Sequence, residues 1–139
     1  MNKQNILIDM STILKNYKQN KLSQIDFQSV TLSPNEKNIL IVLANNEMST
    51  PAAIADILGV SKALVTRSIK ALADKKLISI QVNPDDRRSL KILLTENGEE
   101  LAEVCRQVRQ DFISQLTNGI AAKDLNTFTE VLTKMLSNL

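Results

Sequence analysis

The chain has 139 residues, 43% of them hydrophobic, with three glycines and three prolines. This length and composition fit one mostly helical domain or two small lobes. The formal net charge of +2 indicates no partner by itself, and the absence of histidine excludes the usual catalytic triads and histidine-dependent zinc sites.

Other signals of catalysis, secretion and membrane insertion are also missing. No glycine-rich phosphate loop occurs, and no pair of acidic residues marks a buried helical face, so we expect no enzyme, no metal and no cofactor. The N-terminus lacks the long apolar core of a signal peptide. The longest strictly apolar run, residues 39–44, is too short to span a bilayer, and the single cysteine cannot form an intramolecular disulfide. We expect a cytoplasmic protein that does not contact a membrane.

The first predicted elements are two helices. Ile6, Met10, Ile13 and Tyr17 recur at three- and four-residue steps, which indicates an amphipathic N-terminal helix. A second helix begins at the segment "SPNE", residues 33–36, where a capping serine precedes a proline and a glutamate completes a capping box. This helix ends near the two asparagines at 45–46.

Two further short helices follow at once. Pro51 opens the first of them behind a cap at Ser49 or Thr50, and Gly59 ends it. After a gap of two residues, Ser61 caps a helix that we expect to run over 61–75. Two short helices joined by a tight turn that contains glycine are typical of a helix-turn-helix, although an ordinary helical hairpin fits the spacing too.

A β-hairpin is predicted next. Residues 77–82 and 89–94 contain β-branched side chains in partial alternation, and the turn-rich stretch 83–88 joins them. Helix, turn, helix and hairpin together predict a winged helix. The expected fold class is therefore mainly α with a small β-hairpin wing (α+β).

Two amphipathic helices complete the chain. One starts at Thr95 and carries an apolar stripe that includes Cys105; the other follows a break at 118–119. Apolar faces at both ends of the chain must be covered, which predicts a homodimer, with packing inside one chain as the alternative. We divide the chain into an N-terminal helix of the dimerisation region (1–32), a winged helix-turn-helix DNA-binding domain (33–95) and C-terminal dimerisation helices (96–139).

Basic residues concentrate in the middle of the chain. Between positions 59 and 91 eight residues are basic and three are acidic, which indicates a surface for a polyanion, although a solvated lysine face gives the same count. The helix over 61–75 can enter the major groove of double-stranded DNA with its polar face toward the base edges. In the groove, lysine and arginine can donate hydrogen bonds to guanine or bind phosphates, and threonine can contact a base or a phosphate. The Ala–Leu pair can pack on a thymine methyl group, and the capping serine is well placed to bind a phosphate. The candidate contacts are Ser61, Lys62, Ala63, Leu64, Thr66, Arg67 and Lys70.

The expected wing carries two arginines behind two acids, in "NPDDRR" at 83–88. A long and permanently charged arginine suits the narrow, negative minor groove. A neighbouring carboxylate can orient such a guanidinium. The alternative is a solvated charged turn.

The segment "DDRRSLKILLTENGEEL" resembles the wing of the MarR family, written as D, x, R, several residues, L, T, two residues and G. Asp86, Arg88, Leu94, Thr95 and Gly98 match in register. Upstream, "TPAAIADILGVSKALVTRSIKALADKKLI" resembles the helix-turn-helix of the same family. The resemblance implies a homodimeric winged-helix transcription factor, often a repressor, with Arg88 in the minor groove, Asp86 orienting it and residues 61–67 reading bases.

The resemblance also implies further sites. Arg87, between the matched positions, becomes a phosphate contact. A small-molecule effector pocket between the dimer helices and the DNA-binding lobe would be lined by Met10, Tyr17 and Phe27, although each also fits ordinary core. Cys105 fits a buried small hydrophobe, and the N-terminal reactive cysteine of the family's peroxide sensors is missing.

Three positions depart from the family pattern. Lys76 stands where glycine is common, Ile80 where arginine is common, and Leu64 where a small polar residue is common. We expect a sequence-specific DNA-binding regulator, a repressor that binds a pseudo-palindromic operator as a homodimer and is released by a small-molecule effector. The alternative function is a winged helix used as a protein–protein interaction module.

Overall fold

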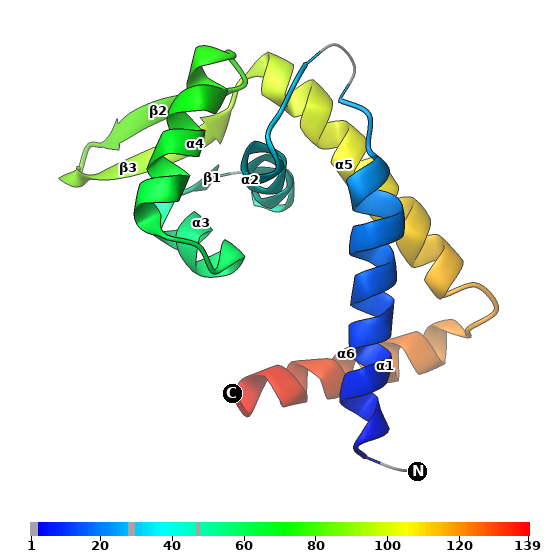
Figure 1. Ribbon diagram of the computed structural model, residues 1–139. Coiled ribbons are helices and arrows are strands. Elements are labelled where there is room, and N and C mark those ends of the chain that lie inside the picture. The colour runs from blue at the N-terminus through cyan, green and yellow to red at the C-terminus, as the bar shows by residue number, and fades with distance from the viewer. Residues whose placement is uncertain (1–2, 28–29, 47) are drawn as a thin grey trace. The chain divides into compact units, whose positions relative to one another are not determined.

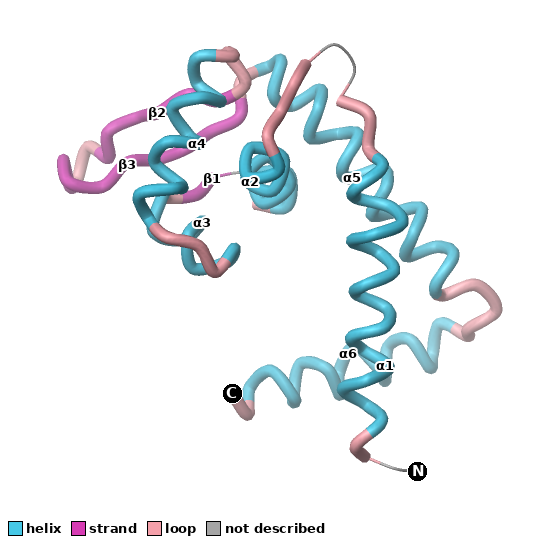
Figure 2. Tube along the Cα trace, viewed as in Figure 1, coloured by secondary structure: helices cyan, strands magenta, loops and turns pink. Residues whose placement is uncertain are grey.

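The computed structural model describes residues 3–27, 30–46 and 48–139 (Figures 1 and 2). The chain forms two compact units, Met1–Val108 and Arg109–Leu139. The elements of the first unit, in order, are α1 (Asn5–Asn16), a π-helical turn (Tyr17–Lys21), a 3₁₀ turn (Leu22–Gln24), α2 (Pro34–Asn45), β1 (Met48–Ser49), α3 (Pro51–Leu58), α4 (Lys62–Asp74), β2 (Ile78–Asn83) and β3 (Asp86–Leu94). The long helix α5 (Glu96–Leu116) begins in this unit and ends in the second, which also contains α6 (Ala122–Ser137).

Helix starts and stops follow the local sequence signals. Ser33 Oγ accepts the amide of Glu36 at 3.2 Å while Glu36 Oε2 accepts the amide of Ser33 at 3.1 Å, which confirms the capping box. Thr50 caps α3 and Ser61 caps α4, each through a 3.1 Å bond from the backbone N–H three residues on. Gly59 ends α3 with φ 65°, a left-handed conformation that glycine adopts without steric cost.

One apolar core joins the helix-turn-helix to the sheet. Its most deeply buried side chains come from α2, α3, α4 and β3, whose contributing helices gather beside the sheet in Figure 1. These side chains are Ile39, Leu40, Leu43, Ile54, Val65, Leu72 and Ile92. Burial of this set fixes how α3 and α4 sit on α2, because each helix presents a single apolar face to the same cluster.

The sheet is antiparallel with strand order β1-β3-β2. The mainly α fold with a hairpin wing is thus confirmed. Two details differ from the sequence expectation: β3 begins at Asp86 rather than Ser89, and β1, which pairs with Leu93 and Ile92, was not expected. Pairing of Asn83 with Asp86 shortens the turn to Pro84 and Asp85. A two-residue strand such as β1 has no alternation to read, so only its partner defines it.

A polar corner joins α4, β2 and α5. The amide of Thr95 donates to the carbonyl of Leu77 at 3.0 Å, and its hydroxyl donates to the carbonyl of Lys76 at 2.6 Å. The same hydroxyl oxygen accepts the amide of Gly98 at 3.1 Å, so Thr95 caps α5 while holding the start of β2. Lys76 itself has φ 62°, a left-handed conformation that favours glycine, the residue that the resemblance led us to expect at this position.

The terminal helices leave apolar side chains uncovered. Neither α1 nor α6 has a buried residue among those that the structure describes. On α1, Leu14 is 56% exposed and Leu7 and Ile8 are more so; on α6, Phe128 is 60% exposed. Each helix therefore carries an apolar surface for which the described chain supplies no cover.

Candidate DNA interface

Helix α4 separates its side chains into a buried and an exposed face. Val65, Ser68, Ile69 and Leu72 are buried against the rest of the unit. Six of the seven predicted contacts on this helix are exposed, and the seventh, Leu64, is half-buried. The exposed six are Ser61, Lys62, Ala63, Thr66, Arg67 and Lys70. The polar face is therefore accessible along the whole helix, with three cationic side chains on it.

Two hydroxyl groups of this face have partners inside the helix. Ser61 Oγ accepts the amide of Leu64 at 3.1 Å, and its own proton is left to donate outward. Thr66 Oγ1 donates to the carbonyl of Lys62 at 2.9 Å. Because that bond uses the only proton of Thr66 Oγ1, this hydroxyl faces a partner as an acceptor and through its methyl group. The sequence had not distinguished these two roles.

The wing tip is a tight turn followed by an irregular strand. The amide of Asp85 donates to Asn83 Oδ1 at 3.1 Å, which closes a turn through the asparagine side chain. The register between β2 and β3 shifts after Val82, so the residues just behind Asp86 lie outside the regular ladder. Arg88 stands in this segment and is exposed. Figure 1 shows the β2–β3 hairpin projecting away from the helices, with this turn at its free end.

Asp86 acts on the backbone of the wing. Its Oδ1 accepts the backbone amide of Arg88 at 3.0 Å. Between the described side chains of Asp86 and Arg88 no ion pair is found, so the carboxylate shapes the bulge that presents Arg88 rather than holding its guanidinium. The side chain of Arg87, the predicted phosphate contact, lies outside what the structure describes.

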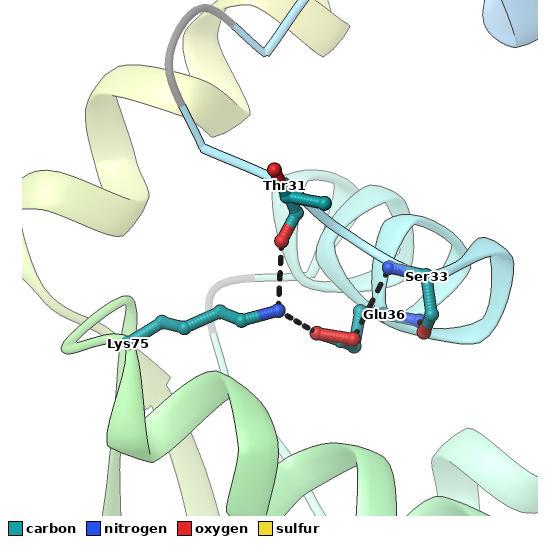
Figure 3. Close-up of polar contacts among 4 residues, drawn as sticks. All are labelled: Thr31, Ser33, Glu36 and Lys75. Atoms are coloured by element: carbon teal, nitrogen blue, oxygen red, sulfur yellow. Dashed lines mark hydrogen bonds and ion pairs between the residues drawn. The ribbon is translucent and has the colours of Figure 1, made fainter.

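A polar cluster that the sequence did not predict lies at the far end of α4. Lys75, the residue that ends α4, pairs with Glu36 of α2 and donates to the carbonyl of Thr31 at 2.8 Å (Figure 3). Burial alone would raise the pKa of Glu36, but hydrogen bonds from Lys75 and Ser33 outweigh it and hold the pKa below its ordinary value. The capping box at Glu36 was readable from sequence, but its partner 39 residues away was not.

The three predicted effector residues differ in their burial. Met10 is exposed, Tyr17 is half-buried and Phe27 is buried in the core. Two cavities formed by described residues have other walls. One of about 540 Å³ lies among α2, α3 and the turns after α1, and one of about 460 Å³ lies between α3 and the wing strands. None of the three predicted residues lines either cavity, and the effector site stays a prediction.

The described residues were also searched for a metal site, a reactive cysteine and a membrane-spanning helix. Among them, no group of three or more His, Cys, Asp and Glu side chains is arranged to hold a metal. Cys105 is buried, and burial raises the pKa of its thiol to about 11, which keeps it protonated. No helix in the described part of the chain is long and apolar enough to cross a membrane.

Known proteins resemble this chain in sequence and in fold. The MarR family model matches residues 30–89, which run from just before α2 to the wing. The multiple antibiotic resistance protein MarR of Escherichia coli K12 is 32% identical over 88 residues, or 63% of this chain and 61% of that protein. Residues 30–89 are therefore a MarR-family segment. The crystal structure of apo MarR from E. coli has the same fold, with a TM-score of 0.64 at 23% identity, over 98% of this chain and 97% of that one.

A second relative extends the match over more of the chain. The uncharacterised HTH-type transcriptional regulator YdgJ of Bacillus subtilis 168 is 24% identical over 121 residues, which is 86% of this chain and 74% of that protein. These relatives are transcriptional regulators and not enzymes. The predictions of family, of winged helix-turn-helix fold and of a non-enzymatic regulator are confirmed.

Proposed function

We propose that this MarR-family chain is a repressor that binds a pseudo-palindromic operator as a homodimer. The observation that carries the proposal is the exposed polar face of α4, with Lys62, Arg67 and Lys70 opposite a fully buried apolar face. A helix with these side chains fits the major groove, where arginine or lysine can donate to guanine O6 and N7. The whole segment 61–75 is the proposed recognition helix. Because such a regulator must reach chromosomal DNA, we assign it to the cytoplasm.

The wing supplies the second contact in this proposal. Arg88 is exposed in a bulged segment whose backbone Asp86 holds, which suits a side chain that enters the minor groove. In the same proposal Arg87 binds a phosphate. The winged helix at 33–95 thus contacts DNA, and the helices at 1–32 and 96–139 form the dimerisation region.

The uncovered apolar surfaces of α1 and α6 support a second copy of the chain as the partner. A change of Leu14 to Glu tests this, because a side chain that is 56% exposed in one chain tolerates charge unless a partner covers it. We expect the parent to have a dimeric mass by light scattering at micromolar concentration, and Leu14→Glu to have a monomeric mass. Lys15→Glu, one position further along α1, is the matched control and stays dimeric. A monomeric parent refutes the dimer.

DNA recognition is tested by selecting bound duplexes from a random pool and measuring affinity for the selected site. We expect an inverted repeat with half-site centres about one helical turn apart, roughly 34–36 Å. Arg88→Ala should weaken binding while the thermal midpoint stays unchanged, and Lys123→Ala, an equal loss of charge on α6, should leave binding near that of the parent. Arg88→Ala with parental affinity would remove the wing from the interface.

The alternative, a protein-binding winged helix, rests on a different surface. Ile80 and Val82 on β2 are exposed apolar side chains, and Ile57 on α3 is another. A protein-binding module would return no enriched sequence in the selection, whereas the regulator returns an inverted repeat. Release of the operator by a small molecule is the last part of the proposal, and it calls for an affinity measurement in the presence of candidate ligands.

A further inference from the structure

The pair formed by Lys75 and Glu36 joins three segments of the first unit. Lys75 ends α4, Glu36 lies in the first turn of α2, and Thr31 precedes that helix. Figure 3 shows the ammonium of Lys75 between the carbonyl oxygen of Thr31 and the Glu36 carboxylate, whose second oxygen accepts the amide of Ser33. Glu36 is only 5% exposed, so the carboxylate is held among these donors rather than by water.

Lys75 differs from the other basic residues of the middle segment. Its ammonium already contacts two oxygen atoms of the protein, and one of them carries a full negative charge. A lysine that bound a phosphate of DNA would have to give up this buried carboxylate, leaving it without its cationic partner. Lys62 and Lys70, by contrast, extend from α4 as exposed side chains.

We propose that Lys75 and Glu36 are positioning residues that hold the C-terminal end of α4, so that its exposed side chains meet the base edges in one fixed orientation. The inference rests on the proposed DNA-binding function and deepens it. The side chains that pack α4 on the unit are mainly apolar, Val65, Ile69 and Leu72, and apolar contact is non-directional. The amide of Leu77 also donates to the carbonyl of Leu72, but that bond joins α4 to the residues that follow it directly in the chain. The ion pair and the bond to Thr31 are directional, and they act at one end of the helix.

The size of the effect follows from helix geometry. Arg67 lies eight residues before Lys75, or about 12 Å along the axis at 1.5 Å per residue. A tilt of about 5° around the held end moves the backbone at Arg67 by about 1 Å. Hydrogen bonds weaken steeply beyond their narrow range of distance and angle, so such a tilt is enough to lose a bidentate contact to guanine. Contacts to phosphates, which flexible side chains make from many angles, tolerate it.

The test compares the full-length parent with Glu36→Gln, with the double variant Glu36→Gln/Lys75→Met, and with Glu100→Gln. The last is the control, since it removes one negative charge from an exposed position on α5. For each protein, affinity is measured for the selected operator and for a scrambled duplex of equal length and composition, over a range of salt concentrations. The measurement is made well below the thermal midpoint of every variant.

We expect Glu36→Gln to bind the operator about 5- to 150-fold more weakly, the loss that one mismatched base pair causes. Its affinity for scrambled DNA and its salt dependence stay at the parental values, and Glu100→Gln behaves as the parent. The double variant loses no more than Glu36→Gln alone, because the two residues act as one unit. If Glu36→Gln is too unstable to measure, the double variant, which leaves no unpaired charge, is judged by the same criteria.

Opposite outcomes overturn the inference. Parental or tighter binding of Glu36→Gln to both duplexes, with a salt slope steeper by about 0.9, means that the freed Lys75 binds a phosphate. If the double variant binds both duplexes more weakly by the same factor, with a salt slope shallower by about 0.9, the result also means that Lys75 binds a phosphate in the parent. A parent that prefers no sequence refutes the proposed function itself, whereas a specific parent with an equally specific Glu36→Gln refutes only the positioning role.

Discussion

Replacing Gly98 with Ala should destabilise the protein, although the same change usually stabilises a helix. Gly98 lies in the first turn of α5, and a Cβ built there would fall well inside contact distance of the Leu77 carbonyl oxygen and 2.9 Å from its carbon. It would also lie 3.2 Å from Leu94 Cδ2, which can turn aside. The Leu77 carbonyl cannot turn aside, because it accepts the amide of Thr95 at 3.0 Å and its residue's amide is bonded to the carbonyl of Leu72.

The magnitude follows from three contributions. Alanine gains about 1 kcal/mol over glycine inside a helix. Forcing an extra carbon against a fixed backbone costs about 1–3 kcal/mol. Relief of the clash by moving α5 away from β2 loses the two hydrogen bonds of Thr95 to Leu77 and Lys76, about 1 kcal/mol each. The net loss of stability is about 2–4 kcal/mol.

Urea unfolding followed by far-ultraviolet circular dichroism measures this loss, since a chain without tryptophan has little intrinsic fluorescence to follow. Parent and variant are compared at one protein concentration, because the stability of the proposed dimer depends on that concentration. Asn97→Ala, an exposed neighbour in the same turn, is the control and should change stability by less than about 0.5 kcal/mol. A Gly98→Ala protein as stable as the parent would refute the close approach of α5 to Leu77.

Three further predictions concern single residues. Lys76→Gly should stabilise the chain by about 0.5–1 kcal/mol in the same urea assay, because the left-handed φ of 62° at this position strains any side chain. The hydrogen bond from Thr95 to the backbone carbonyl of residue 76 is kept in this variant. A loss of stability would contradict this prediction. The lowered pKa of Glu36 means that in acid the unfolded chain binds more protons than the folded chain. The contribution of Glu36 to the free energy of unfolding is therefore present above about pH 4.5, the ordinary glutamate value, and is lost as the pH falls below it. Glu36→Gln should flatten that part of the curve of stability against pH, and an unchanged curve would exclude Glu36 as its source. Cys105, buried and with a thiol pKa of about 11, should resist a thiol-specific reagent at pH 8 in the native protein and react once urea unfolds it; rapid native labelling would show that the site opens.

Much of the fold was predictable because its signals are local. The caps at Ser33, Thr50 and Ser61 and the stop at Gly59 depend on residues within one helical turn, and the structure has them where the sequence indicated. The β-hairpin was expected, but the predicted turn, residues 83–88, was longer than the observed one. The register shift behind Asp86 depends on pairing with β2, which no single strand's sequence contains.

The candidate interface divides in the same way. Helical periodicity alone separated the exposed face of α4 from its buried face, and the exposures of Lys62, Thr66 and Arg67 agree with it. The sequence expectation for Asp86 assigned its carboxylate to the guanidinium of Arg88, whereas the structure has it on the backbone amide. Both arrangements suit the same two residues, and only the path of the bulged strand distinguishes them.

The sequence by itself determined the helices, the order of the winged helix and the family, because each depends on neighbouring residues or on a pattern that runs along the chain. Only the tertiary structure decided why position 98 must be glycine, why Lys76 is strained, and which basic residue between positions 59 and 91 pairs with a buried carboxylate. Those answers depend on partners 19 to 39 residues away, Thr95 for Lys76 and Glu36 for Lys75, and a chain brings such groups together only when its core packs. The motif "DDRR" could be recognised in the sequence, but the pairing of Glu36 with Lys75 at the end of α4 could not.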